Sequence, residues 1–256
     1  MIALHRPPGT RAAIVHTHRQ GPGGRVARVL LGGLGSAATL DLLPALAHPL
    51  LDRGSVTVMD WVGAGWSDHD DAWGHRLEDH AGTVVSLLDH LGLRGVSLVG
   101  HSFGGSVAVL VAAGRPDLVG HLVVAEPNLD PGVGTFSAAV AGWDEASFVA
   151  TGHAAVLADL RAASDPTAAA LARTLAWASP VGLHRAAVSL LSDRRPTLRA
   201  LLSGLAVERT FLAGARSDVD LDAAAATGCT VRVVPDAGHH MPADNLEGFC
   251  AAVAAC

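Results

Sequence analysis

The chain has 256 residues, half of them hydrophobic, and a net charge of −6 at pH 7. This length suits one large domain with an inserted segment rather than two independent domains. The acidic balance excludes the clustered basic surface of a nucleic-acid-binding protein, and no apolar run approaches the length of a membrane span. Lysine and tyrosine are missing from the sequence, so neither can take part in catalysis.

Strands and helices are predicted to alternate along most of the chain. In chain order, we expect strands over 28–31, 55–59, 96–99, 122–125, 210–213 and 231–234, and helices over 40–51, 76–91, from about 103 to 113, 221–226 and from about 246. This alternation predicts an α/β fold with a mostly parallel, doubly wound sheet and helices on both faces. The residues before the first of these strands, above all residues 12–17, are expected to add antiparallel strands at one edge.

The alternation stops between residues 126 and 209. Residues 127–207 are rich in alanine and follow a helical period. The helical period is broken by Pro131, Pro166, Pro180 and Pro196. We expect three or four short helices here, forming a cap over the carboxyl ends of the strands. The predicted division is therefore a core of residues 1–126 and 208–256 and a helical cap, or lid, of residues 127–207.

A Gly-His-Ser-Phe-Gly pentapeptide at 100–104 lies between a predicted strand and a predicted helix. In that context, a G-x-S-x-G sequence forms a tight, strained turn that presents its serine at the edge of the sheet. Small residues at positions 100 and 104 let the strand and helix backbones approach closely. Ser102 is therefore the candidate nucleophile, and the N–H group of Phe103 faces the same side.

A serine hydroxyl needs a neighbouring base, and the base needs an acid to orient it. In a doubly wound sheet, the base should come from a loop after a later strand. Residues 231–240 provide a strand, a turn of small residues and two histidines. We favour His239, directly after Gly238, over His240 as the base.

Four motifs in this order resemble those of the α/β-hydrolase fold family. They are residues 30–36, residues 60–67, the serine pentapeptide and the loop that carries His239. The resemblance extends over nearly the whole chain and implies acyl transfer through a covalent intermediate, with an oxyanion hole made by the N–H groups of Leu34 and Phe103. The chain departs from the family at Gly32, where histidine is common. A serine at the turn argues against the family's epoxide hydrolases and dehalogenases, which place aspartate there.

The family places the acid of the triad after the strand that follows the helix of the turn, or after the next strand beyond the cap. Glu126 fits the first position and Asp218 the second, with Asp130 a more remote third. The stretch from Asp218 to His239 is short for the usual helix and strand. A carboxylate at the end of a buried strand also needs a partner, which His239 would give Glu126. We favour Glu126 and keep Asp218 as the alternative.

The substrate pocket is expected between the sheet and the cap. Its expected lining is mostly apolar and predicts an ester, thioester or lactone with a hydrophobic acyl part. The candidate substrate-binding residues are Trp66, Phe136, Trp143, Trp177 and Met241, and further candidate wall residues are Leu34, Phe103 and Phe148. No metal or organic cofactor is expected.

Other functions remain open from the sequence. The same triad could cleave a C–C or amide bond, perform perhydrolysis, or transfer an acyl group, as in the cyclisation of a product of secondary metabolism. A non-catalytic small-molecule binder and a protein-interaction module are two further alternatives. Because residues 1–9 have no signal-peptide stretch and Cys229, Cys250 and Cys256 lack paired spacing, we expect a cytoplasmic protein without a membrane partner. The oligomeric state cannot be predicted.

Overall fold

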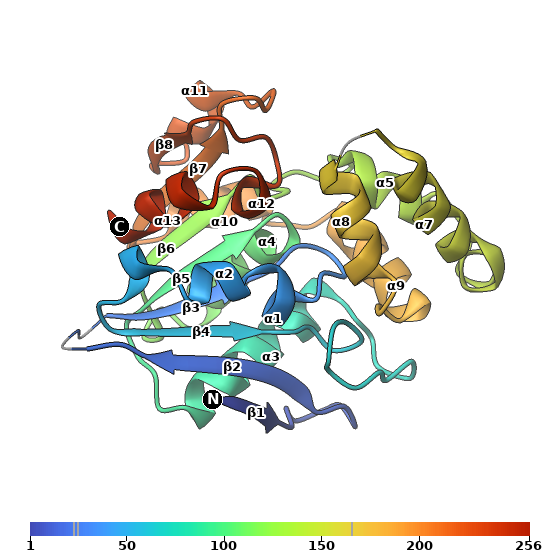
Figure 1. Ribbon diagram of the computed structural model, residues 1–256, viewed down its shortest axis with the longest axis horizontal. Coiled ribbons are helices and arrows are strands. Elements are labelled where there is room, and N and C mark those ends of the chain that lie inside the picture. The colour runs from blue at the N-terminus through green and yellow to red at the C-terminus, as the bar shows by residue number, and fades with distance from the viewer. Residues whose placement is uncertain (23, 25, 165) are drawn as a thin grey trace.

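A computed structural model describes residues 1–22, 24, 26–164 and 166–256. Over these residues, eight strands form one sheet in the order β1-β2-β4-β3-β5-β6-β7-β8 (Figure 1). The strands are β1 (Ile2–His5), β2 (Ile14–Gln20), β3 (Ala27–Leu31), β4 (Ser55–Met59), β5 (Val96–His101), β6 (Val119–Ala125), β7 (Glu208–Gly214) and β8 (Thr230–Val234). The β1–β2 and β2–β4 pairs are antiparallel, and the remaining pairs are parallel.

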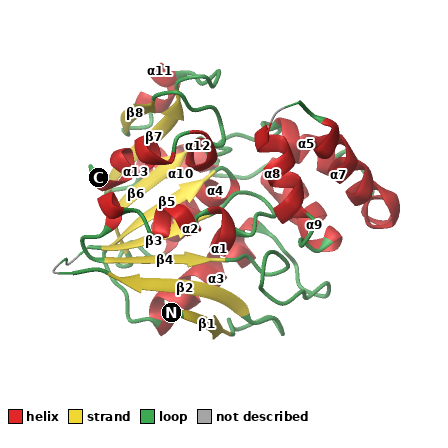
Figure 2. Cartoon of the chain, viewed as in Figure 1, coloured by secondary structure: helices red, strands yellow, loops and turns green. Residues whose placement is uncertain are grey.

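The central strands are covered on both faces of the sheet. Every residue of β4 and β5 is buried, as expected for short apolar runs in a parallel sheet between helices. Because side chains alternate along a strand, Val29 and Leu31 enter one hydrophobic core and Leu30 enters the other. Figure 2 shows helices on both sides of the sheet. The predicted fold class is therefore confirmed.

The helices of the core follow the strands in sequence. They are α1 (Ala38–Asp41), α2 (Leu43–Leu46), the 3-10 helix η1 (Pro49–Leu51), α3 (Leu77–His90), α4 (Phe103–Gly114), α11 (Leu221–Ala225), α12 (Met241–Asp244) and α13 (Leu246–Ala254). The core on one face contains residues of α3 and α4, and that on the other face contains residues of α2 and α13. Among the described helices, none has the length and apolar character needed to cross a membrane.

Two details of the first third of the chain differ from the prediction. The single helix expected over residues 40–51 is divided into α1, α2 and η1. Pro44 and Pro49 lie in the first turns of the second and third of these elements, because proline fits the first turn of a helix but interrupts its interior. The bounds of strand β1 were not predicted, although antiparallel edge strands were expected among the early residues, and β1 pairs antiparallel with β2 at the edge of the sheet.

The segment between β6 and β7 is helical. Its helices are α5 (Thr135–Ala141), α6 (Glu145–Ser147), the π-helix η2 (Phe148–Gly152), α7 (His153–Ala162), α8 (Pro166–Leu175), α9 (Pro180–Leu191) and α10 (Leu198–Gly204). Figure 1 shows α5, α7, α8 and α9 gathered beyond one end of the sheet, whereas α10 packs against α4. We propose that the cap consists of α5 to α9 and that α10 belongs to the core.

The cap is joined to the loop after β4. The N–H group of Ser179 donates to the carbonyl oxygen of Gly63 at 2.7 Å, and its hydroxyl donates to Asp71 at 2.7 Å. The guanidinium of Arg185 donates to the carbonyl oxygens of Asp71 and Trp73 at 2.7 and 2.9 Å. These hydrogen bonds join α9 and the residue before it to residues 63–73 of the loop after β4.

Candidate active site

Ser102 lies in a strained turn between β5 and α4. Its φ of 54° and ψ of −121° are rare for a residue with a side chain, and such strain collects at functional sites. A Cβ atom on Gly100 would lie 2.3 Å from the carbonyl oxygen of Gly104, and one on Gly104 would lie 2.6 Å from that of Gly32. Only glycine fits at these two positions, so the close approach of β3, β5 and α4 holds Ser102 at the edge of the sheet.

His239 and Glu126 form a hydrogen-bonded pair beside this turn. Nδ1 of His239 lies 2.8 Å from Oε2 of Glu126, and the other carboxylate oxygen accepts the N–H group of Gly214 at 2.8 Å. Glu126 follows β6 directly and has a φ of 45°. Because an ionised carboxylate accepts only, Nδ1 of His239 carries the proton and Nε2 has a free lone pair.

The environment of Glu126 favours its ionised form. Only 8% of the residue is exposed, and burial by itself would raise the pKa of the carboxyl. The hydrogen bonds from His239 and Gly214 outweigh that effect, and the pKa of Glu126 is lowered. The carboxylate is thus available to orient the imidazole and to stabilise it when it gains a proton.

The two other candidate acids lie elsewhere. Asp218 is exposed in the loop after β7. Asp130 forms an ion pair with Arg199 of α10, in which Nη2 and Oδ2 are 2.7 Å apart. Of the three carboxylates considered, only Glu126 bonds to His239 within the described residues.

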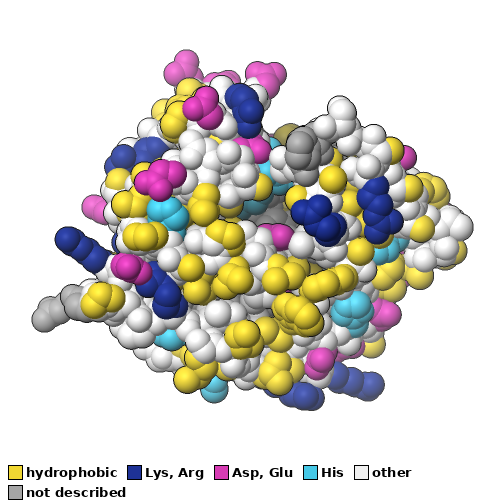
Figure 3. Space-filling model, viewed as in Figure 1, with side chains coloured by type: hydrophobic (Ala, Val, Ile, Leu, Met, Phe, Trp, Pro, Cys, Tyr) yellow, Lys and Arg dark blue, Asp and Glu magenta, His cyan; other side chains and the backbone are white. Residues whose placement is uncertain are grey.

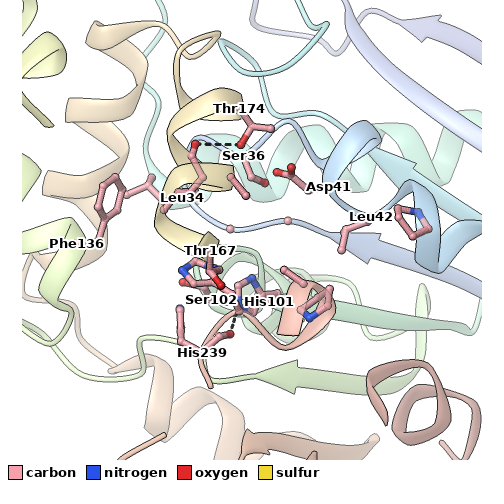
Figure 4. Close-up of a pocket in the computed structure, with 18 of the residues that line it drawn as sticks. Leu34, Ser36, Asp41, Leu42, His101, Ser102, Phe136, Thr167, Thr174 and His239 are labelled. Atoms are coloured by element: carbon pink, nitrogen blue, oxygen red, sulfur yellow. Dashed lines mark hydrogen bonds between the residues drawn. The ribbon is translucent and has the colours of Figure 1, made fainter. Parts of the chain in front are cut away.

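His101 ties the serine turn to the histidine loop. Its Nε2 donates to the carbonyl oxygen of His239 at 2.7 Å, shown as a dashed line in Figure 4. Burial, together with the neighbouring His239 and His240, lowers the pKa of His101 to about 3. The ring is therefore neutral near pH 7 and acts as a fixed hydrogen-bond donor between the two loops.

The loop after β3 carries the predicted oxyanion donors. Within the described part of the chain, the N–H groups of Leu34 and Phe103 have no hydrogen-bond acceptor. The indole Nε1 of Trp61 lies 3.2 Å from the carbonyl oxygens of both Gly32 and Gly33. The ring of Trp61 also packs edge-on against Phe103, with centroids 5.4 Å apart. Trp61, which the sequence analysis did not single out, thus holds a loop that lacks a side chain at Gly32.

Asp60 supports the same loop from the side of β4. This fully buried carboxylate accepts the N–H and hydroxyl groups of Thr39 at 2.8 and 2.6 Å and the N–H group of Trp66 at 2.9 Å. Burial raises the pKa of Asp60, and these hydrogen bonds oppose the rise. Asp60 therefore links α1 to the turn after β4.

A cavity of about 480 Å³ opens above Ser102 and His239. Figure 4 shows both residues on one side of it, and in Figure 3 a hollow with histidine inside has hydrophobic, basic and acidic side chains around its rim. The lining beyond the serine, the histidine and the loop glycines is Leu34, Ser36, Asp41, Leu42, Pro44, His101, Phe136, Thr167, Ala170, Leu171, Thr174, His240, Pro242, Ala243 and Leu246. Most of these side chains are apolar.

Of the predicted substrate-binding residues, Phe136 lines this cavity and four do not. Trp66 and Trp177 form an exposed edge-to-face pair with ring centroids 4.9 Å apart, joining the cap to the loop after β4. Trp143 packs against Gly152 in the cap, and Met241 is fully buried in the core. These four residues, predicted to line the substrate pocket, therefore do not line this cavity.

Two further wall candidates are also core residues. Phe148 is buried in the packing of the cap, and the ring of Phe103 is buried against Trp61. Leu34 lines the cavity as predicted.

Most of the residues that line the cavity were not predicted from the sequence. One side of α8 contributes Thr167, Ala170, Leu171 and Thr174. Their spacing of three, four and seven residues from the first marks one face of a helix and was visible in the sequence. The other wall residues come from α1, α2 and the turn around α12, whose short helices give no such periodicity.

The described residues offer no group of three or more His, Cys, Asp or Glu side chains that could hold a metal ion. Cys229, Cys250 and Cys256 are free thiols. Burial raises the pKa of Cys250 to about 12, so this thiol stays protonated near pH 7.

Known proteins resemble the chain in sequence and structure. A family model for the alpha/beta hydrolase fold matches residues 29–245. Lipase LipV of Mycobacterium tuberculosis is 34% identical over 113 residues, which is 44% of this chain and 41% of LipV. A haloalkane dehalogenase of Mycolicibacterium paratuberculosis is 35% identical over 122 residues, covering 45% of this chain and 38% of that enzyme. The chain thus matches about two fifths of the length of these relatives.

A solved structure resembles the whole chain. The esterase EaEST of Exiguobacterium antarcticum superposes with a TM-score of 0.80 over all of this chain and 98% of its own, at 18% identity. At that identity, the likeness concerns the fold alone. The family model extends over most of the chain and agrees with the sheet order and the serine turn. The chain therefore belongs to the alpha/beta hydrolase fold family.

Proposed function

We propose that this chain is a serine hydrolase that cleaves an ester, thioester or lactone with a hydrophobic acyl part. The observation that carries the proposal is the hydrogen bond of 2.8 Å between His239 and Glu126, beside a serine held in a strained turn. A nucleophile, a base and an orienting acid at one cavity are the minimum for acyl transfer at neutral pH.

Each residue has a defined part in the proposed reaction. His239 takes the proton of Ser102 through Nε2 as the serine oxygen attacks the substrate carbonyl. The N–H groups of Leu34 and Phe103 donate to the oxygen that becomes negative. His239 then gives the proton to the leaving group, and water attacks the acyl-enzyme by the same route in reverse. Glu126 holds the imidazole and balances its positive charge in both halves.

The position of Ser102 is consistent with this sequence of steps. Within the described residues, its Oγ has no hydrogen-bond partner, and the residue lines the cavity together with His239. In enzymes without substrate, the hydrogen bond between nucleophile and base is often long and shortens when substrate binds. The serine oxygen is therefore free to meet a carbonyl carbon in the cavity.

The size and lining of the cavity support the substrate class. Its volume of about 480 Å³ falls within the range of roughly 300–1,000 Å³ that is common for small-molecule sites. The apolar wall made by Leu42, Leu171, Leu246 and Phe136 favours an acyl chain over a charged group. Ser102 also separates the chain from the dehalogenases among its relatives, because a serine ester intermediate suits acyl rather than alkyl transfer.

The proposal is tested by hydrolysis of a short p-nitrophenyl ester by wild type and by Ser102→Ala. Loss of the nucleophile should lower kcat by roughly 10⁴-fold or more. Ser106→Ala is the matched control, since Ser106 lies one turn along α4, is fully buried and donates to the carbonyl oxygen of Asn128. The control should keep kcat within a few-fold of wild type.

Two results would contradict the proposal. Substantial hydrolysis by Ser102→Ala would show that another group is the nucleophile. Failure of the wild type to hydrolyse esters, thioesters and lactones of several chain lengths would favour a small-molecule binder or a different bond as the target.

A further inference from the structure

One carboxylate stands out in the mostly apolar wall. Asp41, the last residue of α1, is the only acidic side chain among the described residues that line the cavity. The proposed reaction gives it no part, because the triad acid is Glu126 on another loop. Carboxylates in apolar pockets are retained at a cost in stability, which makes them candidates for ligand binding.

The protein does not neutralise Asp41 with a cation. Among the described residues, no arginine or histidine forms an ion pair with it, although Arg173 of α8 is near enough to stabilise its charge. The surrounding protein raises the pKa of Asp41 to about 6 through burial, and the nearby Asp60 adds to the rise. Asp41 is nevertheless open to solvent through the cavity. A ligand can therefore reach the carboxylate.

Two hydroxyl groups accompany Asp41. Thr174 lies close enough to lower the pKa of the carboxyl, and its hydroxyl also donates to the carbonyl oxygen of Leu171 at 3.2 Å. Ser36 is only 7% exposed, and its buried Oγ has no hydrogen-bond partner in the described structure. In the view of Figure 4, Asp41, Ser36 and Thr174 gather on one side of the cavity, and Ser102 and His239 lie on the other.

We propose that Asp41, Ser36 and Thr174 form a polar subsite that binds a hydrogen-bond donor, a hydroxyl or a protonated amine, on the part of the substrate away from the bond that is cleaved. This inference rests on the proposed function of the same cavity. It narrows the substrate from any hydrophobic ester to one whose chain carries such a donor beyond its apolar portion.

The chemistry of the three side chains selects a donor over an acceptor. A carboxylate accepts hydrogen bonds only, and a serine hydroxyl both donates and accepts. A methyl group at this point would give the carboxylate and the orphaned Ser36 oxygen no hydrogen bond from the substrate. Sites built in this way discriminate against analogues that lack the donor, because their own polar groups then remain unpaired.

The experiment compares matched p-nitrophenyl esters over a series of chain lengths. In each set, the acyl chain ends in a methyl, a hydroxyl or an ammonium group, and kcat/KM is measured at pH 8. We expect the wild type to prefer the donor-bearing ester by tenfold or more at one chain length. Asp41→Leu should lower kcat/KM for the donor-bearing ester to about the value for the methyl-ended ester of the same length.

Two further variants sharpen the result. Asp41→Asn keeps a hydrogen-bond acceptor without the charge, so it should lose the preference for ammonium and keep part of that for hydroxyl. Asp159→Asn removes one negative charge from α7 outside the cavity and should leave both preferences unchanged.

The outcomes distinguish a failure of the polar subsite from a failure of the proposed function. If the wild type hydrolyses esters with no preference at any chain length, or if Asp41→Leu keeps the preference, the polar subsite is wrong and the serine hydrolase stands. If the wild type hydrolyses none of these esters and no thioester or lactone either, the proposed function fails and the subsite with it.

Discussion

We call the side of the cavity with Ser102, His239 and the loop after β3 its floor, and the remaining lining residues its wall. The two hold their side chains in different ways. On the floor, hydrogen bonds and backbone contacts between loops position each group: His239 by Glu126 and His101, and the loop after β3 by Trp61. The wall consists mostly of apolar side chains from α2, α5, α8 and residues 242–246, and fewer hydrogen bonds hold it, among them that of Thr167 to Asp244. Chemistry needs fixed geometry, whereas binding an apolar chain needs shape and surface.

Among variants of the floor and the wall, the largest effect should come from replacing Glu126, the proposed acid. Glu126→Gln keeps the size of the side chain but gives His239 an amide partner, so we expect kcat to fall by roughly 10²–10⁴-fold. Asp218→Asn, in an exposed loop, should change kcat less than about twofold. Ester hydrolysis by the two purified variants, with thermal melts to verify folding, makes the comparison. A larger loss in Asp218→Asn would move the acid to the other loop.

A smaller effect should follow from replacing Trp61, which holds the loop after β3. Trp61→Phe keeps the ring contact with Phe103 but removes the donor to Gly32 and Gly33. We expect kcat to fall by about tenfold with KM within twofold, because the oxyanion donors then lose their alignment while binding is kept. Trp73→Phe is the control, since Trp73 packs edge-on against His80 as Trp61 does but forms no hydrogen bond with this loop among the described residues. Equal effects of the two variants would reduce Trp61 to a packing residue.

The wall should respond in KM rather than in kcat. Phe136→Ala removes apolar surface from the cavity, so KM for an ester with a long acyl chain should rise by roughly 3–10-fold. Trp177→Ala removes a larger ring from the exposed pair with Trp66 and should change KM less than twofold. Steady-state kinetics on one long and one short ester measures both. A larger effect of Trp177 would restore the wall predicted from the sequence.

The smallest effect should be on the melting temperature and on its dependence on pH. Burial raises the pKa of Asp41 from an ordinary 3.8 to about 6 in the folded protein. The folded state therefore binds more protons than the unfolded state between these values, and its stability falls as pH rises from about 4 to 6. Asp41→Asn removes this loss, so its Tm should exceed that of wild type by roughly 1–3 °C at pH 8, after allowance for solvent screening.

The same variant should show no gain at pH 4, where Asp41 is protonated in the folded protein. Thermal melts of both proteins at the two pH values provide the measurement. An equal difference in Tm at both pH values would mean that the charge of Asp41 has no part in it.

The sequence predicted the floor better than the wall for a physical reason. Gly100 and Gly104 are required by close contacts between backbones, and such requirements leave fixed spacings in the sequence. The choice between Glu126 and Asp218 depended on where the loops after β6 and β7 lie relative to His239, which only the assembled sheet decides. Glu126 was nevertheless favoured, because a carboxylate at the end of a buried strand needs a partner.

The wall depends on tertiary packing that short helices do not encode. Aromatic residues of the cap were expected to face substrate, yet Trp143 and Phe148 pack within the cap itself. Proline divided the first predicted helix and so placed Asp41 at the end of α1 rather than within a longer helix. Trp61 was not singled out because its indole N–H contacts two carbonyl groups of another loop, and no local sequence pattern indicates such a contact.

The central claim is that Ser102 is activated by His239 and Glu126, and covalent labelling tests it most directly. A fluorophosphonate probe reacts with an activated serine, and the modified peptide is located by mass spectrometry of the digested protein. We predict one label per chain, on Ser102, at a rate that falls at least tenfold in Glu126→Gln and is unchanged in Asp218→Asn. Labelling of another residue, or of Ser102 at the same rate in Glu126→Gln, would contradict the claim.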